Sequence, residues 1–155
     1  MPEAKKLLIE RFHQDFLTLS ILFTLLIVMT VVLLIVYAVK FKRSTTRFRI
    51  GMPAFTLLLI AFTFFFGLFV SKYYRDYVYL KANDPIYIEG KVTGFSITVS
   101  DDLTVTKSWP IVLVDETNEE IALSVVRSEE KLEIDQEYAF WYLPNTKTAE
   151  IVPSK

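Results

Sequence analysis

Residues 16–39, FLTLSILFTLLIVMTVVLLIVYAV, decide the fold class of this chain because they contain no charged residue over 24 positions. A second uncharged run of 22 residues, IGMPAFTLLLIAFTFFFGLFVS, covers residues 50–71. An α-helix needs roughly 20 apolar residues to cross the hydrocarbon core of a bilayer. A soluble protein of 155 residues would lack the polar surface to cover two such helices. Both runs therefore predict transmembrane helices, and their short connector makes them antiparallel neighbours.

The charged residues are segregated along the chain. Residues 1–81 contain 11 Lys and Arg against 4 Asp and Glu, whereas residues 82–155 contain 6 against 14. This division predicts a membrane half followed by a small acidic domain at residues 85–155. The chain has no cysteine, which excludes disulfides, thiolate chemistry and cysteine metal sites.

The connector between the predicted helices, residues 40–49, indicates the orientation in the membrane. Its sequence KFKRSTTRFR contains five basic residues and no acidic one. Basic loops stay in the cytoplasm, so we expect a multi-pass cell-membrane protein whose N-terminus and C-terminal domain are extracytoplasmic. The flanks of the two helices carry six more dispersed basic residues, so the reverse topology remains the alternative. The lipid-headgroup and topology residues are Lys40, Lys42, Arg43, Arg47 and Arg49.

Two further segments flank the predicted spans. In residues 1–15, Leu8 and Phe12 recur at helical spacing among charged residues, which predicts an amphipathic lead-in at the membrane interface. His13, the single histidine, fits there as an interfacial polar residue. Residues 72–84 contain four tyrosines, which predicts an aromatic linker at headgroup level.

Small residues predict how the two helices pack. Thr63, Gly67 and Ser71 recur every four positions, and this spacing lets helix backbones approach closely. Counted from the connector, Ser20 and Thr24 of the first helix lie at the same depth. We therefore predict that the two sets face each other, with a homodimer as the alternative use of the stripe.

The two spans contain no ionisable residue. Transporters and proton pumps place ionisable groups inside the bilayer because ions and protons need partners there. This chain is therefore not expected to form a transport path alone, although it can be a subunit beside one.

From residue 86 onward, apolar residues alternate with polar ones, as in β-strands. Five short strands are predicted, with a bend or bulge near Gly94 and one helical turn within RSEEKLEIDQE. This pattern predicts a small five-stranded β-barrel of OB-like type, with an SH3-like barrel as the alternative.

Residues 86–153 also resemble uncharacterised bacterial membrane proteins that carry a small all-β domain. The resemblance is carried by a G-x-V strand at 90–92, a P-x-V strand at 110–112, and an aromatic strand that ends Tyr-x-Pro at 142–144. It implies no known reaction and no catalytic residue.

The domain offers no set of residues for catalysis or cofactor binding. Its acidic pairs at 101–102, 115–116, 119–120 and 129–130 lie in predicted turns, where solvated carboxylates are usual. We predict no catalytic residue, no cofactor and no metal. The net charge of −8 over residues 82–155 opposes nucleic-acid binding, which depends on Lys and Arg.

The strand YAFWYL, residues 138–143, is apolar on both faces, so one face is either covered or exposed to a partner. The candidate partner face consists of Trp109, Trp141 and Leu143, with ordinary core packing as the alternative. We expect a non-enzymatic accessory or interaction protein of a membrane or envelope complex, whose partners are the bilayer and either another protein or further copies of the chain. The alternative is a small subunit of a transport or secretion machine.

Overall fold

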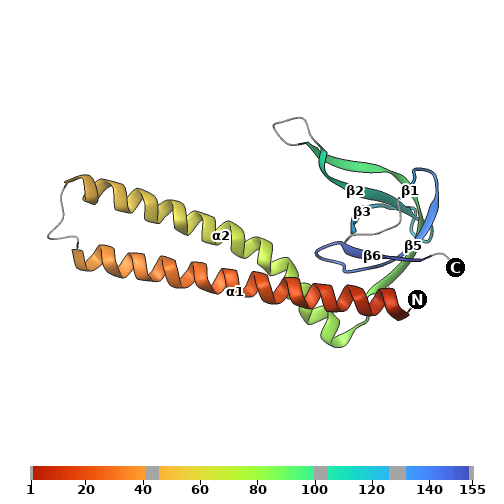
Figure 1. Cartoon of the computed structure of the whole chain (residues 1–155), viewed down its shortest axis with the longest axis horizontal. Coiled ribbons are helices and arrows are strands. Elements are labelled where there is room, and N and C mark those ends of the chain that lie inside the picture. Colours follow the sequence, from red (N-terminus) through yellow and green to blue (C-terminus); the bar gives the residue numbers. More distant parts are fainter. Residues whose placement is uncertain (1, 41–45, 100–104, 126–131, 154–155) are drawn as a thin grey trace. The chain divides into compact units, whose positions relative to one another are not determined.

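The computed structural model describes residues 2–40, 46–99, 105–125 and 132–153, which contain two helices and six strands (Figure 1). The chain divides into two compact units. Met1–Gln14 and Arg75–Lys155 form the first, which we call the sheet unit. Asp15–Tyr74 forms the second, the hairpin unit.

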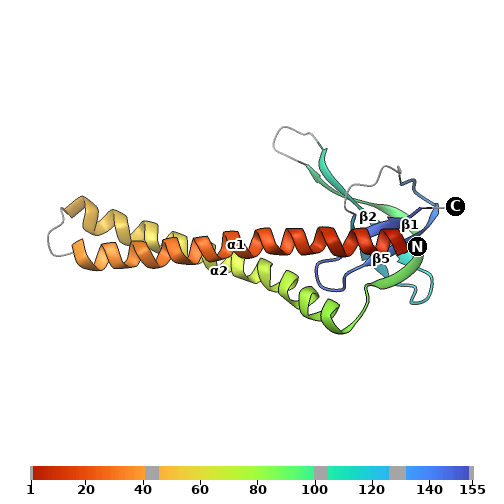
Figure 2. The same ribbon diagram turned by 60° about the horizontal axis from the view of Figure 1, so that its bottom comes forward.

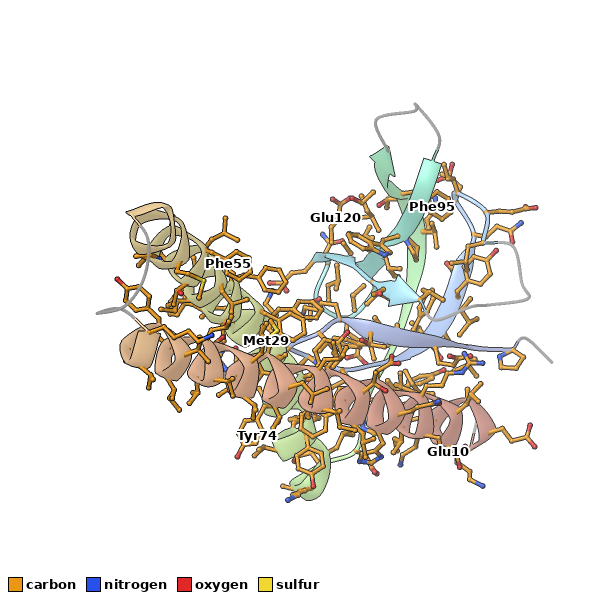
Figure 3. The ribbon with its side chains drawn as sticks, turned by 60° about the vertical axis from the view of Figure 1, so that its left-hand side comes forward. Glu10, Met29, Phe55, Tyr74, Phe95 and Glu120 are labelled. Carbon is orange, nitrogen blue, oxygen red and sulfur yellow. The ribbon has the colours of Figure 1, made fainter. Side chains whose placement is uncertain are left out.

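The hairpin unit contains most of helix α1, Pro2–Lys40, and of helix α2, Thr46–Ala82. Within this unit the two helices lie side by side (Figure 1). Both are long and apolar enough to cross a membrane, and the most apolar 18-residue stretch in each has a mean hydropathy of 3.1 and 2.3, respectively. Their large side chains point outward: Met29 and Phe55, labelled in Figure 3, keep 47% and 51% of their surface exposed. The predicted linker 72–84 is largely helical because α2 continues to Ala82.

The sheet unit contains a single mixed sheet within the described residues. Its strands are β1 (Ile86–Val99), β2 (Val105–Val114), β3 (Glu120–Ala122), β4 (Ser124–Val125), β5 (Glu137–Tyr142) and β6 (Thr148–Val152). They are ordered β3-β2-β1-β5-β6-β4. All neighbours are antiparallel except β4 and β6, which are parallel.

The expected closed barrel is not observed, because the sheet remains open between β3 and β4. The predicted third strand is divided at Leu123, whose N–H donates to the carbonyl oxygen of Pro110 in β2. The next residue, Ser124, donates instead to the carbonyl oxygen of Lys147, just before β6. The chain therefore leaves one edge of the sheet and joins the other, and no ladder connects β3 to β4. Of residues 127–137, where one helical turn is predicted, 127–131 lie outside the described residues, and residues 132–137 contain no helix.

An irregularity in the pairing of β1 with β2 lies at the expected glycine. The register shifts between Val92 and Gly94, which leaves Thr93 as the extra residue of a bulge. The Thr93 hydroxyl donates to the carbonyl oxygen of Ile111, 3.3 Å away.

The core of the sheet unit lies on one face of the strands. Its buried side chains come from β1, β2, β5 and β6 and from Leu123, and Ile121 of β3 and Val125 of β4 pack against them while partly buried. Because side chains alternate across a strand, each strand sends every second residue into this cluster. Its buried members are Ile88, Val92, Val112, Val114, Leu123, Phe140, Tyr142, Ala149 and Ile151.

The first turns of α1 belong to the sheet unit and lie beside β5 and β6 (Figures 1 and 2). Ala4, Leu8 and Phe12, which share one helix face, are 7%, 0% and 1% exposed. The sequence had placed this apolar stripe at the membrane interface. In the structure it is covered by protein instead, because strand β5 is apolar on both faces and its second face also needs covering.

Candidate functional site

The most elaborate polar arrangement in the sheet unit is formed where the two helices meet the β5–β6 hairpin, residues 137–152. Asp76 of α2 is fully buried. Its Oδ1 accepts hydrogen bonds from the backbone N–H and side-chain amide of Asn145, at 3.0 and 2.7 Å. Its Oδ2 accepts from the backbone N–H and hydroxyl of Thr146, both at 2.7 Å. The carboxylate thus holds the β5–β6 turn against α2.

A second contact joins the same hairpin to α1. Arg11 Nη1 lies 3.1 Å from Glu150 Oε2, and the Glu150 side chain is only 10% exposed. Burial raises the pKa of the Glu150 carboxyl, and the Arg11 guanidinium partly offsets this rise. Desolvation is therefore the larger effect on this carboxyl, and the ion pair compensates for it incompletely.

A third contact lies over β5. The Lys5 ammonium is 2.8 Å from Asp84 Oδ2 and 5.6 Å from the centre of the Trp141 ring. Trp141 in turn packs against Tyr87 across the β1–β5 pair, with ring centroids 5.1 Å apart. The Trp141 Nε1 atom is buried and has no hydrogen-bond partner among the described residues.

These three contacts fix helix ends to a sheet and do not assemble reactive groups. The Asp76 carboxylate is occupied by four donors, and the Glu150 carboxylate faces a guanidinium. Among the described residues, no three His, Asp or Glu side chains lie close enough together to hold a metal ion. The arrangement is suited to positioning, and we call these residues the helix-docking site: Lys5, Arg11, Asp76, Trp141, Asn145, Thr146 and Glu150.

Two tyrosines of the sheet unit have shifted acidities. A hydrogen bond to Glu89 raises the pKa of the Tyr87 hydroxyl, and burial raises the pKa of Tyr142. Both hydroxyls therefore stay protonated at neutral pH and act as hydrogen-bonding groups.

The predicted partner face does not form one exposed patch. Leu143 is fully buried, Trp141 is half-buried beneath Lys5, and Trp109 is 38% exposed. Leu143 is thus a core residue, as the alternative interpretation held. Lys5 of α1 lies over the Trp141 ring, and Trp109 is the most exposed of the three residues.

The residue of α1 that faces Gly67 differs by one position from the predicted Thr24. A Cβ atom on Gly67 would lie 3.1 Å from Phe23 Cζ, so Gly67 faces Phe23. Thr24 is exposed, and its hydroxyl donates to the carbonyl oxygen of Ser20. Neighbouring residues of a helix point about 100° apart, so the one-residue difference changes the packed face.

The other stripe residues occupy different positions. Thr63 Oγ1 lies 3.3 Å from Thr30 Oγ1, which joins the two helices by a hydroxyl pair. The Ser71 hydroxyl donates within α2 to the carbonyl oxygen of Leu68. An apolar groove of about 390 Å³ lies between the helices, lined by residues that include Phe23, Thr30, Thr63 and Gly67.

The topology residues are only partly described. Lys40 is exposed at the last turn of α1. Arg47 and Arg49 lie in the first turn of α2. Lys42 and Arg43 lie outside the described residues.

The sequence missed Asp76, Arg11 and Glu150 as docking residues. Two signals were present: Asp76 is the one acid in the tyrosine-rich segment 72–81, and Glu150 stands between Ala149 and Ile151 in a short apolar strand. Neither signal identifies a partner, because the contacts span 69 to 139 residues of sequence.

No protein-family model matches this chain, and neither the curated proteins nor the solved structures include a significantly similar one.

Proposed function

We propose that this chain is a two-pass membrane protein that presents a small acidic sheet domain as an accessory or interaction module of a membrane or envelope complex. The exposed surface of the hairpin unit supports membrane insertion. The helices expose large apolar side chains along the hairpin unit, with Leu58 and Phe65 each 68% exposed. In water such a surface would be covered or would aggregate, whereas lipid tails solvate it.

The observation that carries the two-span arrangement is the Arg11–Glu150 contact. It places the segment before the first predicted span against the sheet that follows the second span. Both segments must then lie on one side of the bilayer, which requires an even number of spans. With the basic connector in the cytoplasm, that side is extracytoplasmic.

We further infer that the sheet is an opened OB-like arrangement. If β3 and β4 are taken as two halves of one strand, pairing runs from β1 through β2, β3–β4, β6 and β5 back to β1. The parallel β4–β6 pair and the non-consecutive β1–β5 pair are features of a Greek-key barrel and are absent from a simple meander.

A non-enzymatic role is supported by the helix-docking site, whose carboxylates are committed to donors within the protein. The acidic charge of residues 82–155 also disfavours nucleic acid as a partner. The proposed partners are therefore the bilayer and a protein, with no cofactor.

A second candidate function, a small subunit of a transport or secretion machine, is favoured by the groove between the helices. Thr63 and Gly67 leave space there that a ridge of side chains from another membrane helix can fill.

Copurification from a mild detergent distinguishes the two functions. A soluble or envelope protein that stays bound when Gly67 is replaced by Leu supports the interaction module. A polytopic partner that is lost on this substitution supports the transport subunit. A reporter enzyme fused after Lys155 tests the orientation: activity restricted to the cytoplasm would contradict the extracytoplasmic sheet.

A further inference from the structure

The turn between β5 and β6, residues 143–147, contains four hydrogen-bond donors that converge on one carboxylate. Asn145 directs its backbone N–H and side-chain amide at Asp76 Oδ1, and Thr146 directs its backbone N–H and hydroxyl at Oδ2. All four donors are neutral. Among the described residues, no lysine or arginine forms an ion pair with Asp76. The carboxylate is therefore bound by directed hydrogen bonds and not by an opposite charge.

Hydrogen bonds that do not involve Asp76 hold this turn in shape. The backbone N–H of Leu143 donates to the carbonyl oxygen of Thr148 at 2.9 Å, and that of Lys147 donates to the carbonyl oxygen of Leu143 at 3.0 Å. The Thr146 hydroxyl oxygen accepts from the backbone N–H and the hydroxyl of Thr148, at 3.3 and 3.0 Å. A hydroxyl has one proton and two lone pairs, so only the proton of Thr146 is left for Asp76. The turn itself therefore orients its donors.

The four donors match the shape of a carboxylate. Two of them converge on each of two oxygens, which suits a planar group with two acceptor oxygens. A chloride ion has a single centre and can satisfy only one of the two donor pairs. A phosphate group has further oxygens, and Asp76 is fully buried, so the site offers those oxygens neither donors nor water.

We propose that the β5–β6 turn is a preformed carboxylate-binding site, that Asp76 occupies it as a ligand from the same chain, and that a free carboxylate binds there when the Asp76 carboxylate is removed. The docking of α2 on the sheet is then an intramolecular binding step, because the helix brings the ligand to a site that exists without it. Asn145 and Thr146 are half-buried, so small solutes can reach their donors once the carboxylate is gone. This inference goes beyond the membrane role proposed above and does not depend on it.

Formate tests the proposal because it restores the group that Asp76→Ala removes. The full-length variant is purified in detergent, and its unfolding by urea is followed by the fluorescence of Trp109 and Trp141 as sodium formate is added. A ligand that binds only the folded chain raises the urea midpoint as its concentration increases. We expect this rise with formate, and no rise with sodium chloride at the same ionic strength. Asp76→Asn is the matched control: its amide fills the site, so formate should affect it no more than it affects the natural chain.

Two further substitutions, each combined with Asp76→Ala, test which groups bind formate. Thr146→Val removes one donor and should raise the dissociation constant of formate by about tenfold, because hydrogen bonds to charged groups are the stronger ones. Thr148→Val removes a group that contacts Thr146 and not the carboxylate, and it should also raise this constant. An unchanged constant in Thr146→Val would place formate elsewhere, and an unchanged constant in Thr148→Val would contradict a preformed turn.

The remaining outcomes are also decisive. The absence of a formate effect on Asp76→Ala would overturn the proposal, and so would an equal effect of formate on Asp76→Asn or of chloride on Asp76→Ala. If Asp76→Ala is unfolded without formate, formate present during extraction should restore the circular dichroism spectrum of the natural chain. A variant that stays unfolded at every formate concentration would also contradict the proposal. The Lys155 reporter measures membrane orientation separately, so its result and this one are distinguishable.

Discussion

Two carboxylates buried in the sheet unit show how single residues join the helix ends to the strands. Asp76 has no exposed surface, and Glu150 is 8% exposed. Taking a carboxylate out of water is costly unless hydrogen bonds or an opposite charge replace the water. Asp76 receives four hydrogen bonds from neutral donors, whereas Glu150 faces a guanidinium. The two residues therefore respond differently to substitution and to pH.

Replacing Asp76 with Ala should destabilise the sheet unit by about 3 kcal/mol, because it leaves four half-buried donors on Asn145 and Thr146 without their acceptor. Urea titration in detergent, followed by the fluorescence of Trp109 and Trp141, measures this change. Asp15→Ala removes an exposed carboxylate and serves as the control. Equal stability of the two variants would show that the Asp76 contacts contribute little.

The buried carboxyl group of Glu150 should make the stability of the sheet unit depend on pH. Because burial raises the pKa of this carboxyl, the folded protein binds the Glu150 proton more readily than the unfolded chain does. The group therefore adds stability at acidic pH that is lost as the pH rises through its raised pKa.

The free energy of unfolding of the natural chain, measured relative to Glu150→Gln, should be greatest near about pH 4 and should decrease toward neutrality. Urea titrations of both proteins across this range test the sign. A relative stability that increases with pH would mean that the attraction of Arg11 outweighs desolvation.

At the scale of elements, close backbone approach fixes where β1 pairs with β2. A Cβ atom at Gly90 would overlap the backbone oxygen of Leu113 and lie 2.8 Å from Val112 Cγ1. A Cβ atom at Gly94, in the same strand, would meet nothing within 4 Å. Neither glycine has a positive φ. The two positions therefore differ in the space available for a side chain and not in backbone conformation.

Gly90→Ala should therefore cost about 1–3 kcal/mol by overpacking. Gly94→Ala should change the free energy of unfolding little, and this matched pair differs only in the neighbours of the added methyl group. Thermal unfolding of both variants measures the effect. A larger loss for Gly94→Ala would contradict the strand register described here.

The packing of α1 against α2 also depends on which residues of the two helices face each other. Because Gly67 faces Phe23, cysteines at positions 23 and 67 should form a disulfide within one chain. Cysteines at 24 and 67 should do so far less, because Thr24 is exposed. Mobility shifts of oxidised membranes before and after reduction measure both pairs. Preferential crosslinking of the 24–67 pair would restore the face expected from the small-residue stripe.

At the scale of the whole molecule, the sheet unit is built from two separate parts of the chain, Met1–Gln14 and Arg75–Lys155. The first part supplies Leu8 and Phe12 to cover apolar surface, and Arg11 to pair with Glu150. A fragment that begins after α2 would lack these groups. The two ends of the chain are therefore parts of one folding unit.

Labelling of intact cells with a membrane-impermeant maleimide tests this arrangement. Cysteines at the exposed positions His13 and Glu133 should react from the same side of the membrane. A cysteine at Thr45, in the connector, should react only after the membrane is permeabilised. Reaction of positions 13 and 133 from opposite sides would exclude an even number of spans.

Sequence patterns alone were enough to locate most elements. Long uncharged runs predicted both helices, and alternation predicted β1 at Ile86–Val99 with the bulge beside Gly94. These features depend on neighbouring residues, because apolar length and strand period are local properties of a chain. The same local reasoning predicted β5 and β6 to within a residue at each end.

Only the tertiary structure decided what covers each element. The division of the third strand at Leu123, the pairing of Gly67 with Phe23, and the contact of Lys5 with Trp141 all depend on residues distant in sequence. The docking residues follow the same rule, since Asp76 and Asn145 are 69 positions apart. A residue type indicates that a buried charge needs a partner, but the folded chain determines which partner reaches it.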